Sequence, residues 1–128
     1  MNKNDIINRL EGLNFDKSGY WVLAGSAMVL HGIRPETHDI DMSCTKEFAD
    51  ELEREGYPTV VMPDGTRRIT YAEDLEIFED WIFDKVVSAD GISVISLDGL
   101  LEMKRNLGRE KDLRDVQMIE EFLERMVR

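Results

Sequence analysis

The stretch Leu23–Cys44, which reads LAGSAMVLHGIRPETHDIDMSC, contains the signals that decide the fold. A short apolar strand over Trp21–Ala24 leads into a Gly-Ser turn, and an apolar helix over Ala27–Leu30 follows and stops at a glycine. A second strand then carries two aspartates with one residue between them. This order predicts a strand–turn–helix–strand unit in which the second strand brings the two aspartates forward.

The Gly-Ser turn is suited to an anionic ligand. Gly25 has no side chain, so the backbone can turn and a ligand can approach it closely. Ser26 is a good helix N-cap, and the first turn of a helix presents unpaired N–H groups that suit phosphate oxygens. We therefore predict that Gly25 and Ser26 bind phosphate.

The aspartates that follow indicate a cation. Residues two apart on a strand point to the same face, so Asp39 and Asp41 converge while Ile40 and Met42 point to the other side. Two carboxylates on one face repel each other unless a cation or a proton lies between them. Hard oxygen ligands favour Mg²⁺, or Mn²⁺, and the pair therefore predicts a metal site.

Taken together, these parts resemble the signature of the nucleotidyltransferase superfamily, which has the DNA polymerase β-like fold. The chain is similar to small bacterial members, namely antibiotic nucleotidyltransferases and the nucleotidyltransferase toxins of abortive-infection systems. His31–Arg34 (HGIR) and Arg109–Asp115 (RxKDxxD) also look like that group. The resemblance implies a minimal nucleotidyltransferase that moves a nucleoside monophosphate from an NTP such as ATP to a hydroxyl group of a small molecule, a tRNA or a protein.

The resemblance also implies a third carboxylate on a later strand, flanked by apolar residues. Leu75-Glu76-Ile77 matches that setting, so Glu76 is the candidate third metal ligand and base. Asp74 shares its strand face and is the alternative. Aspartate is commoner at this position in the family, and both acids also fit ordinary exposed residues of a strand edge.

A basic cluster near the C-terminus suits a triphosphate, because Lys supplies a point charge and Arg a bidentate fork. By resemblance, Lys104 and Lys111 would bind the triphosphate, with Asp112 or Asp115 orienting them. In the alternative, Lys111 and Asp115 form an ordinary i,i+4 pair on a solvated helix. The cluster consists of Lys104, Arg105, Arg109, Lys111 and Arg114.

The rest of the chain alternates between helical and strand patterns, which predicts an α/β (α+β) class and a mixed β-sheet covered by helices in one domain over 1–128. Trp81–Asp90 fits either a short helix or a strand. Further strands are predicted at Tyr57–Met62, Thr66–Tyr71, Leu75–Phe78 and Ile92–Ile95, and helices after Asn4, at Lys46–Gly56, after Ser96 and from about Lys111.

Composition limits the partners. Lys+Arg 16 against Asp+Glu 27 gives a net charge of −11, which argues against passive binding to nucleic acid backbones or anionic membranes. No apolar run is long enough for a membrane span, so none is predicted in this sequence. The polar start MNKND does not have the pattern of a signal peptide. The single cysteine, Cys44, fits a reducing cytoplasm and a buried structural role. Tyr20 and Trp21 could form part of a wall on which a nucleobase stacks, although burial in the core is the commoner role of such residues.

A second hypothesis is a catalytically degenerate member that binds a nucleotide or a partner protein, for instance within a toxin–antitoxin pair. The glutamate at position 76 and the small size favour it. The intact Gly-Ser and both aspartates oppose it, because a site without chemistry need not keep like charges together. A chain this short has little room for an acceptor domain, so a homodimer or a partner subunit would supply one wall of the site.

Overall fold

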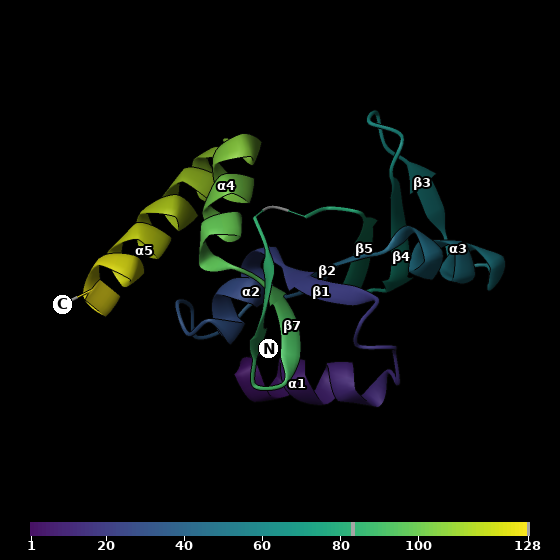
Figure 1. Cartoon of the computed structure of the whole chain (residues 1–128), viewed down its shortest axis with the longest axis horizontal. Helices are drawn as coiled ribbons and strands as arrows, with labels where there is room; N and C mark the ends of the chain where they lie inside the picture. The colour runs from purple at the N-terminus through teal and green to yellow at the C-terminus, as the bar shows by residue number, and fades with distance from the viewer. Residues whose placement is uncertain (83, 128) are drawn as a thin grey trace.

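A seven-stranded mixed sheet organises residues 1–82 and 84–127, the part of the chain that the computed structural model describes (Figure 1). The order in the sheet is β3-β4-β5-β2-β1-β7-β6. The pairs β1–β7 and β2–β5 are parallel and the others antiparallel, which confirms the predicted α+β class. The strands are β1 (Tyr20–Leu23), β2 (Ile40–Cys44), β3 (Thr59–Val61), β4 (Arg67–Ala72), β5 (Leu75–Glu79), β6 (Val86–Ala89) and β7 (Ile92–Ile95).

Five helices accompany the sheet in the described residues. Figure 1 shows α4 and α5 side by side at one end of the molecule, and α3 beside the hairpin of β3 and β4. No helix there is long and apolar enough to cross a membrane. The helices are α1 (Lys3–Gly12), α2 (Ala24–Leu30), α3 (Lys46–Arg54), α4 (Leu97–Leu107) and α5 (Glu110–Val127).

Local capping fixes most of the helix ends. The side chains of Thr45 and Ser96 accept hydrogen bonds from the first turns of α3 and α4, and Gly108 ends α4 in the left-handed conformation. The predicted cap of α1 at Asn4 is wrong. Asn2 caps the helix instead, because its side chain and that of Asp5 bond reciprocally to each other's backbone N–H groups.

The two faces of β2 differ in burial, because one of them packs into the core at the centre of the sheet. Ile40 and Met42 are fully buried, together with Leu75 and Ile77 of the neighbouring strand β5. Burial of such side chains contributes roughly 1.5–3 kcal/mol each, so a one-residue slip of β2 would be costly. The opposite face, which carries Asp41, is thereby fixed toward the helical pair α4 and α5.

The stretch Trp81–Asp90 is resolved in favour of a strand. Its second part forms β6, which pairs antiparallel with β7. The turn between them has positive φ at both Asp90 and Gly91, as a two-residue hairpin requires. Phe83, in the same stretch, lies outside the described residues.

Candidate functional site

The turn from β1 into α2 differs from its prediction. The helix begins at Ala24, which itself has a positive φ of 54°, and Leu23 occupies the N-cap position without a side-chain cap. Ser26 therefore lies within the first turn and is fully buried. Its hydroxyl donates to the Leu23 carbonyl at 2.7 Å and accepts from the Asp41 N–H at 3.2 Å. Ser26 is not the N-cap. Its hydroxyl ties α2 to β2 beside the Asp41 backbone.

Gly25 allows a close approach, but the group that approaches is part of the chain itself. A Cβ at this position would lie 2.9 Å from Thr37 Oγ1 and 3.0 Å from an Arg34 guanidinium nitrogen. The loop after α2 therefore packs directly on the Gly25 backbone. Because Gly25, Arg34 and Thr37 all line one cavity, this contact shapes the wall of the cavity.

Asp39 and Asp41 both line that cavity, although β2 begins at Ile40 and so contains only Asp41. Asp39 is exposed just before the strand, whereas Asp41 is partly buried and lies in register with Glu76 of β5. Burial, Glu76 and Asp39 raise the pKa of Asp41, and Lys104 and Lys111 partly oppose that rise. Close carboxylates thus make the ionised state of Asp41 costly without a cation.

The candidates for the third carboxylate have different partners. The carboxylate of Asp74 accepts two hydrogen bonds from Arg9 of α1, at 3.0 and 3.1 Å, and this contact lowers its pKa. The cationic partner of Glu76 among the described residues is Arg68, at 4.0 Å, and Glu76 is not among the residues that line the cavity. Within the described ranges, no three His, Cys, Asp or Glu side chains are grouped to hold a metal ion.

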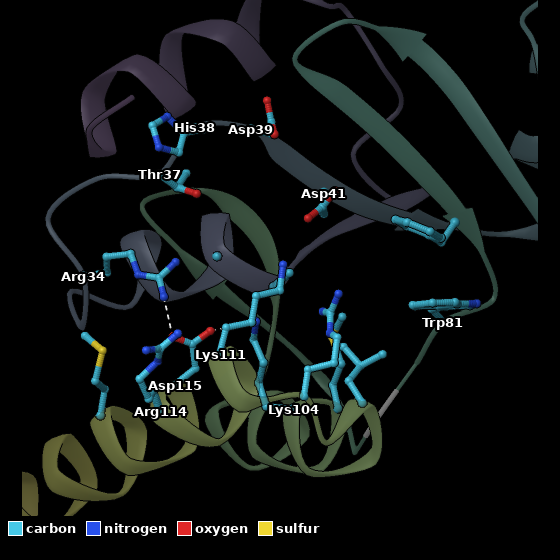
Figure 2. A pocket seen from close by; sticks show the side chains of 17 residues that line it. Arg34, Thr37, His38, Asp39, Asp41, Trp81, Lys104, Lys111, Arg114 and Asp115 are labelled. Atoms are coloured by element: carbon cyan, nitrogen blue, oxygen red, sulfur yellow. Dashed lines mark hydrogen bonds and ion pairs between the residues drawn. The ribbon is translucent and has the colours of Figure 1, made fainter.

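The basic cluster divides into a buried and an exposed part. Lys104 is only 5% exposed, and its Nζ lies 2.9 Å from Asp115 and 3.4 Å from Asp112. Asp115 also pairs with Arg34, which Figure 2 shows as a dashed line. In the described part of the chain Lys111 makes no ion pair with Asp115, so the alternative of an ordinary i,i+4 pair is not observed. Figure 2 shows Lys111 projecting from α5 toward Asp41.

The cavity has a volume of about 640 Å³ and three chemically different regions. Cationic side chains, among them Arg34 and Arg114, face the aspartates, and two stacked aromatic rings form another part of the wall. Reasoning from local pattern missed several lining residues. Some lie close to the aspartates in the sequence but at no spacing that indicates a role, and the two aromatic residues lie far from the aspartates in the sequence. The missed residues are Arg34, Thr37, His38, Phe78 and Trp81.

The remaining residues singled out in the sequence have structural positions. Tyr20 and Trp21 are buried in the core and do not line this cavity. His31 ends α2, and its Nε2 lies 2.7 Å from the Ile95 carbonyl oxygen. Cys44 is buried. Its burial, with a smaller effect of the nearby acidic residues Glu79 and Asp80, raises the pKa of its thiol to about 12.

Comparison with known proteins adds a likeness of fold. No protein-family model matches the chain, and no curated protein matches it. A crystal structure of a Thermotoga maritima protein, provisionally named a nucleotidyltransferase, is 20% identical in sequence, with a TM-score of 0.60. The match covers 98% of this chain and 96% of the other. The two proteins share one fold. The arrangement of the sheet and the helices is therefore one that this other protein also adopts.

Proposed function

We propose that the protein is a nucleotidyltransferase that transfers a nucleoside monophosphate from an NTP to a hydroxyl acceptor, with Mg²⁺ or Mn²⁺. One observation carries the proposal: Asp39 and Asp41 share a single cavity with a set of cationic side chains. A metal-bound triphosphate needs both charges at once, carboxylates for the cation and Lys or Arg for the phosphates. The fold shared with the Thermotoga maritima protein supports the same reading.

The donor set fits a hard cation. Asp39 and Asp41 offer carboxylate oxygens. Burial, Glu76 and Asp39 raise the pKa of Asp41, and a bound cation would offset this cost of ionising it. We assign Glu76 as the third ligand or base, since it lies beside Asp41 while Asp74 is held by Arg9. When bound, the metal would stabilise the charge that develops on the reacting phosphate.

The chain's own side chains would bind and orient the substrate. Lys111, exposed in the cavity, would neutralise the triphosphate, while Arg34 and Arg114 would bind its oxygens. Lys104, held by Asp112 and Asp115, would contribute positive charge from a fixed position. The Glu76 carboxylate would accept the proton of the acceptor hydroxyl.

The second candidate function is a non-catalytic member that binds a nucleotide or a partner protein, as in a toxin–antitoxin pair. The observation that favours it is the arrangement of the carboxylates, because no three potential metal ligands are grouped in the described residues. A homodimer or a partner subunit would then supply further groups. This candidate predicts nucleotide binding without transfer.

An assay of transfer and binding tests both candidates. The protein is incubated with each α-labelled NTP, Mg²⁺ and a panel of hydroxylated antibiotics, tRNA and candidate proteins, and calorimetry follows NTP binding with Mg²⁺ and with EDTA. We expect labelled product, weaker NTP binding in EDTA, and a loss of transfer of roughly 100-fold or more in Asp41→Asn. Asp16→Asn, in a different cavity, is the matched control.

Each contrary result has a distinct meaning. NTP binding that is equal or tighter in EDTA would contradict a site bridged by metal. Metal-dependent binding without labelled product would favour the non-catalytic candidate.

A further inference from the structure

Two aromatic rings in the wall of the cavity stack on each other without being buried in the core. Phe78 of β5 and Trp81, just after it, have ring centroids 4.4 Å apart and an interplanar angle of 25°. Both side chains are partly exposed, and both line the cavity that contains Asp41. Their surface is therefore available to a ligand in the same cavity.

Hydrogen bonds fix this pair to the strand that carries the aspartates. The buried Ser43 hydroxyl donates to the Phe78 carbonyl at 2.6 Å and accepts from the Trp81 N–H at 2.7 Å. The Trp21 indole N–H donates to the Trp81 carbonyl at 2.9 Å. Since Ser43 follows Asp41 by two residues on β2, the rings have a fixed place relative to the carboxylates.

Charge and apolar surface are separated along the cavity. Figure 2 shows Arg34 and Arg114 at the end opposite Trp81, with Asp41 and Lys111 between the two ends. The apolar Met103 and Leu107 also line the cavity, and together with Trp81 they line a smaller adjoining pocket. A ligand that fits this cavity has anionic groups at one end and a flat, uncharged ring at the other.

We infer that Phe78 and Trp81 stack the nucleobase of the NTP, with Ser43 as their positioning residue. This inference rests on the proposed function. Every base has a π-face, so stacking tolerates all four bases but favours the larger ring system. Recognition by stacking therefore predicts tighter binding of purine than of pyrimidine nucleotides.

The test compares ligands with and without a base. Calorimetry measures binding of ATP, CTP and inorganic tripolyphosphate, each with Mg²⁺, to the wild type and to Trp81→Leu, Trp81→Phe, Phe78→Leu and Ser43→Ala. Stacking of one base corresponds to roughly a 5- to 100-fold change in affinity. We expect Trp81→Leu to lose that much ATP affinity and to bind tripolyphosphate normally. Trp81→Phe should bind ATP more tightly than Trp81→Leu does, because it keeps an aromatic ring.

Further variants separate stacking from general effects. Ser43→Ala should weaken ATP binding by a smaller factor and leave tripolyphosphate binding unchanged, because it loosens the rings but removes neither. Tyr57→Leu is the matched control, since Tyr57 stacks on Tyr71 at 4.7 Å in a different cavity. It should bind every ligand like the wild type.

A second measurement needs no variant. ATP should quench tryptophan emission of the wild type, and tripolyphosphate should not. The inference is overturned if the wild type binds ATP no more tightly than tripolyphosphate, or if folded Trp81→Leu and Phe78→Leu bind ATP normally. If the wild type binds neither ligand, the proposed function itself is overturned.

Discussion

Asp74 and Glu76 lie two positions apart at β5, yet their carboxylates have different partners. Asp74 is held by two hydrogen bonds from Arg9, whereas Glu76 lies in register with Asp41 and 4.0 Å from Arg68. The sequence alone could not separate these acids, because the distinction depends on Arg9, which lies on a distant helix. The partner of each carboxylate, more than its residue type, determines its role.

This difference predicts opposite effects of two conservative substitutions. Glu76→Gln should lose most transfer activity, about 100-fold, because a third ligand or base is removed, and should leave stability nearly unchanged. Asp74→Asn should keep activity and lose up to about 1 kcal/mol of stability, since the pair with Arg9 is partly exposed. Transfer assays and denaturant unfolding measure both. The reverse order of activities would move the role to Asp74.

At the scale of elements, α4 and α5 are joined by charges inside their interface. The Lys104 side chain of α4 is buried between Asp112 and Asp115 of α5, and Asp115 reaches Arg34 beyond the end of α2. A buried carboxylate that loses its cation is destabilised strongly, because no water replaces the lost partner. Both Lys104 and Lys111 line the cavity, but only Lys104 also holds the two helices together through ion pairs within the described residues.

Two matched substitutions distinguish these lysines. Lys104→Met should cost about 1.5–3 kcal/mol of unfolding free energy, because Asp112 and Asp115 lose a buried charged partner but keep Arg109 and Arg34. Lys111→Met should leave stability within about 0.5 kcal/mol and weaken NTP binding, since Lys111 is exposed. Urea unfolding and calorimetry with Mg²⁺–ATP provide the two readouts. Equal stability of the two variants would show that Lys104 is not needed for the helix pairing.

Sequence patterns predicted the elements well where the signal was local. The spacing of apolar residues correctly indicated α3 and α4, Ser96 marked the start of α4, and the strand patterns at Tyr57–Met62 and Thr66–Tyr71 indicated the hairpin of β3 and β4. The final helix was also predicted, but its apolar stripe is only partly buried, since Leu113 is exposed. An apolar residue at helical spacing is buried only if another element covers it.

The candidate site was predicted only in part, for a related reason. The spacing of Asp39 and Asp41 placed them on one side of the chain, and both line one cavity, although Asp39 lies just before β2. The role of Ser26 depends on the proximity of α2 to β2, and the pairing of Arg34 with Asp115 joins residues far apart in the chain. Such contacts follow from tertiary packing, which short-range patterns do not reveal.

At the scale of the whole molecule, the charge distribution is uneven. The chain has a net charge of −11, which by self-repulsion opposes the compact state. Five of its cationic residues nevertheless line the cavity of the aspartates: Arg34, Lys104, Arg109, Lys111 and Arg114. The cavity can therefore attract a small polyanion, while the excess of acidic residues disfavours a nucleic acid backbone on the rest of the surface.

The environment of Asp41 predicts how the contribution of this residue to stability depends on pH. The pKa of Asp41 is raised in the folded state by burial and by Glu76 and Asp39, so the folded protein binds this proton more tightly than the unfolded chain does. The tighter binding of this proton by the folded protein stabilises it at low pH. That stabilisation is lost as the pH rises from the ordinary aspartate pKa through the raised pKa of Asp41. At pH 7 the ionised Asp41 is a net cost, which a metal ion would relieve.

Asp41→Asn should therefore melt at the same temperature as the wild type or higher at pH 7 without metal, and the difference should shrink toward pH 4. Asp74→Asn is the control of opposite sign. Because the hydrogen bond from Arg9 lowers the pKa of Asp74, its stabilisation is present at neutral pH and is lost on acidification. Adding Mg²⁺–ATP should raise the melting temperature of the wild type and of Asp74→Asn but not that of Asp41→Asn. An Asp41→Asn variant that melts lower at pH 7, with a wild type indifferent to Mg²⁺–ATP, would indicate that Asp41 is a structural residue.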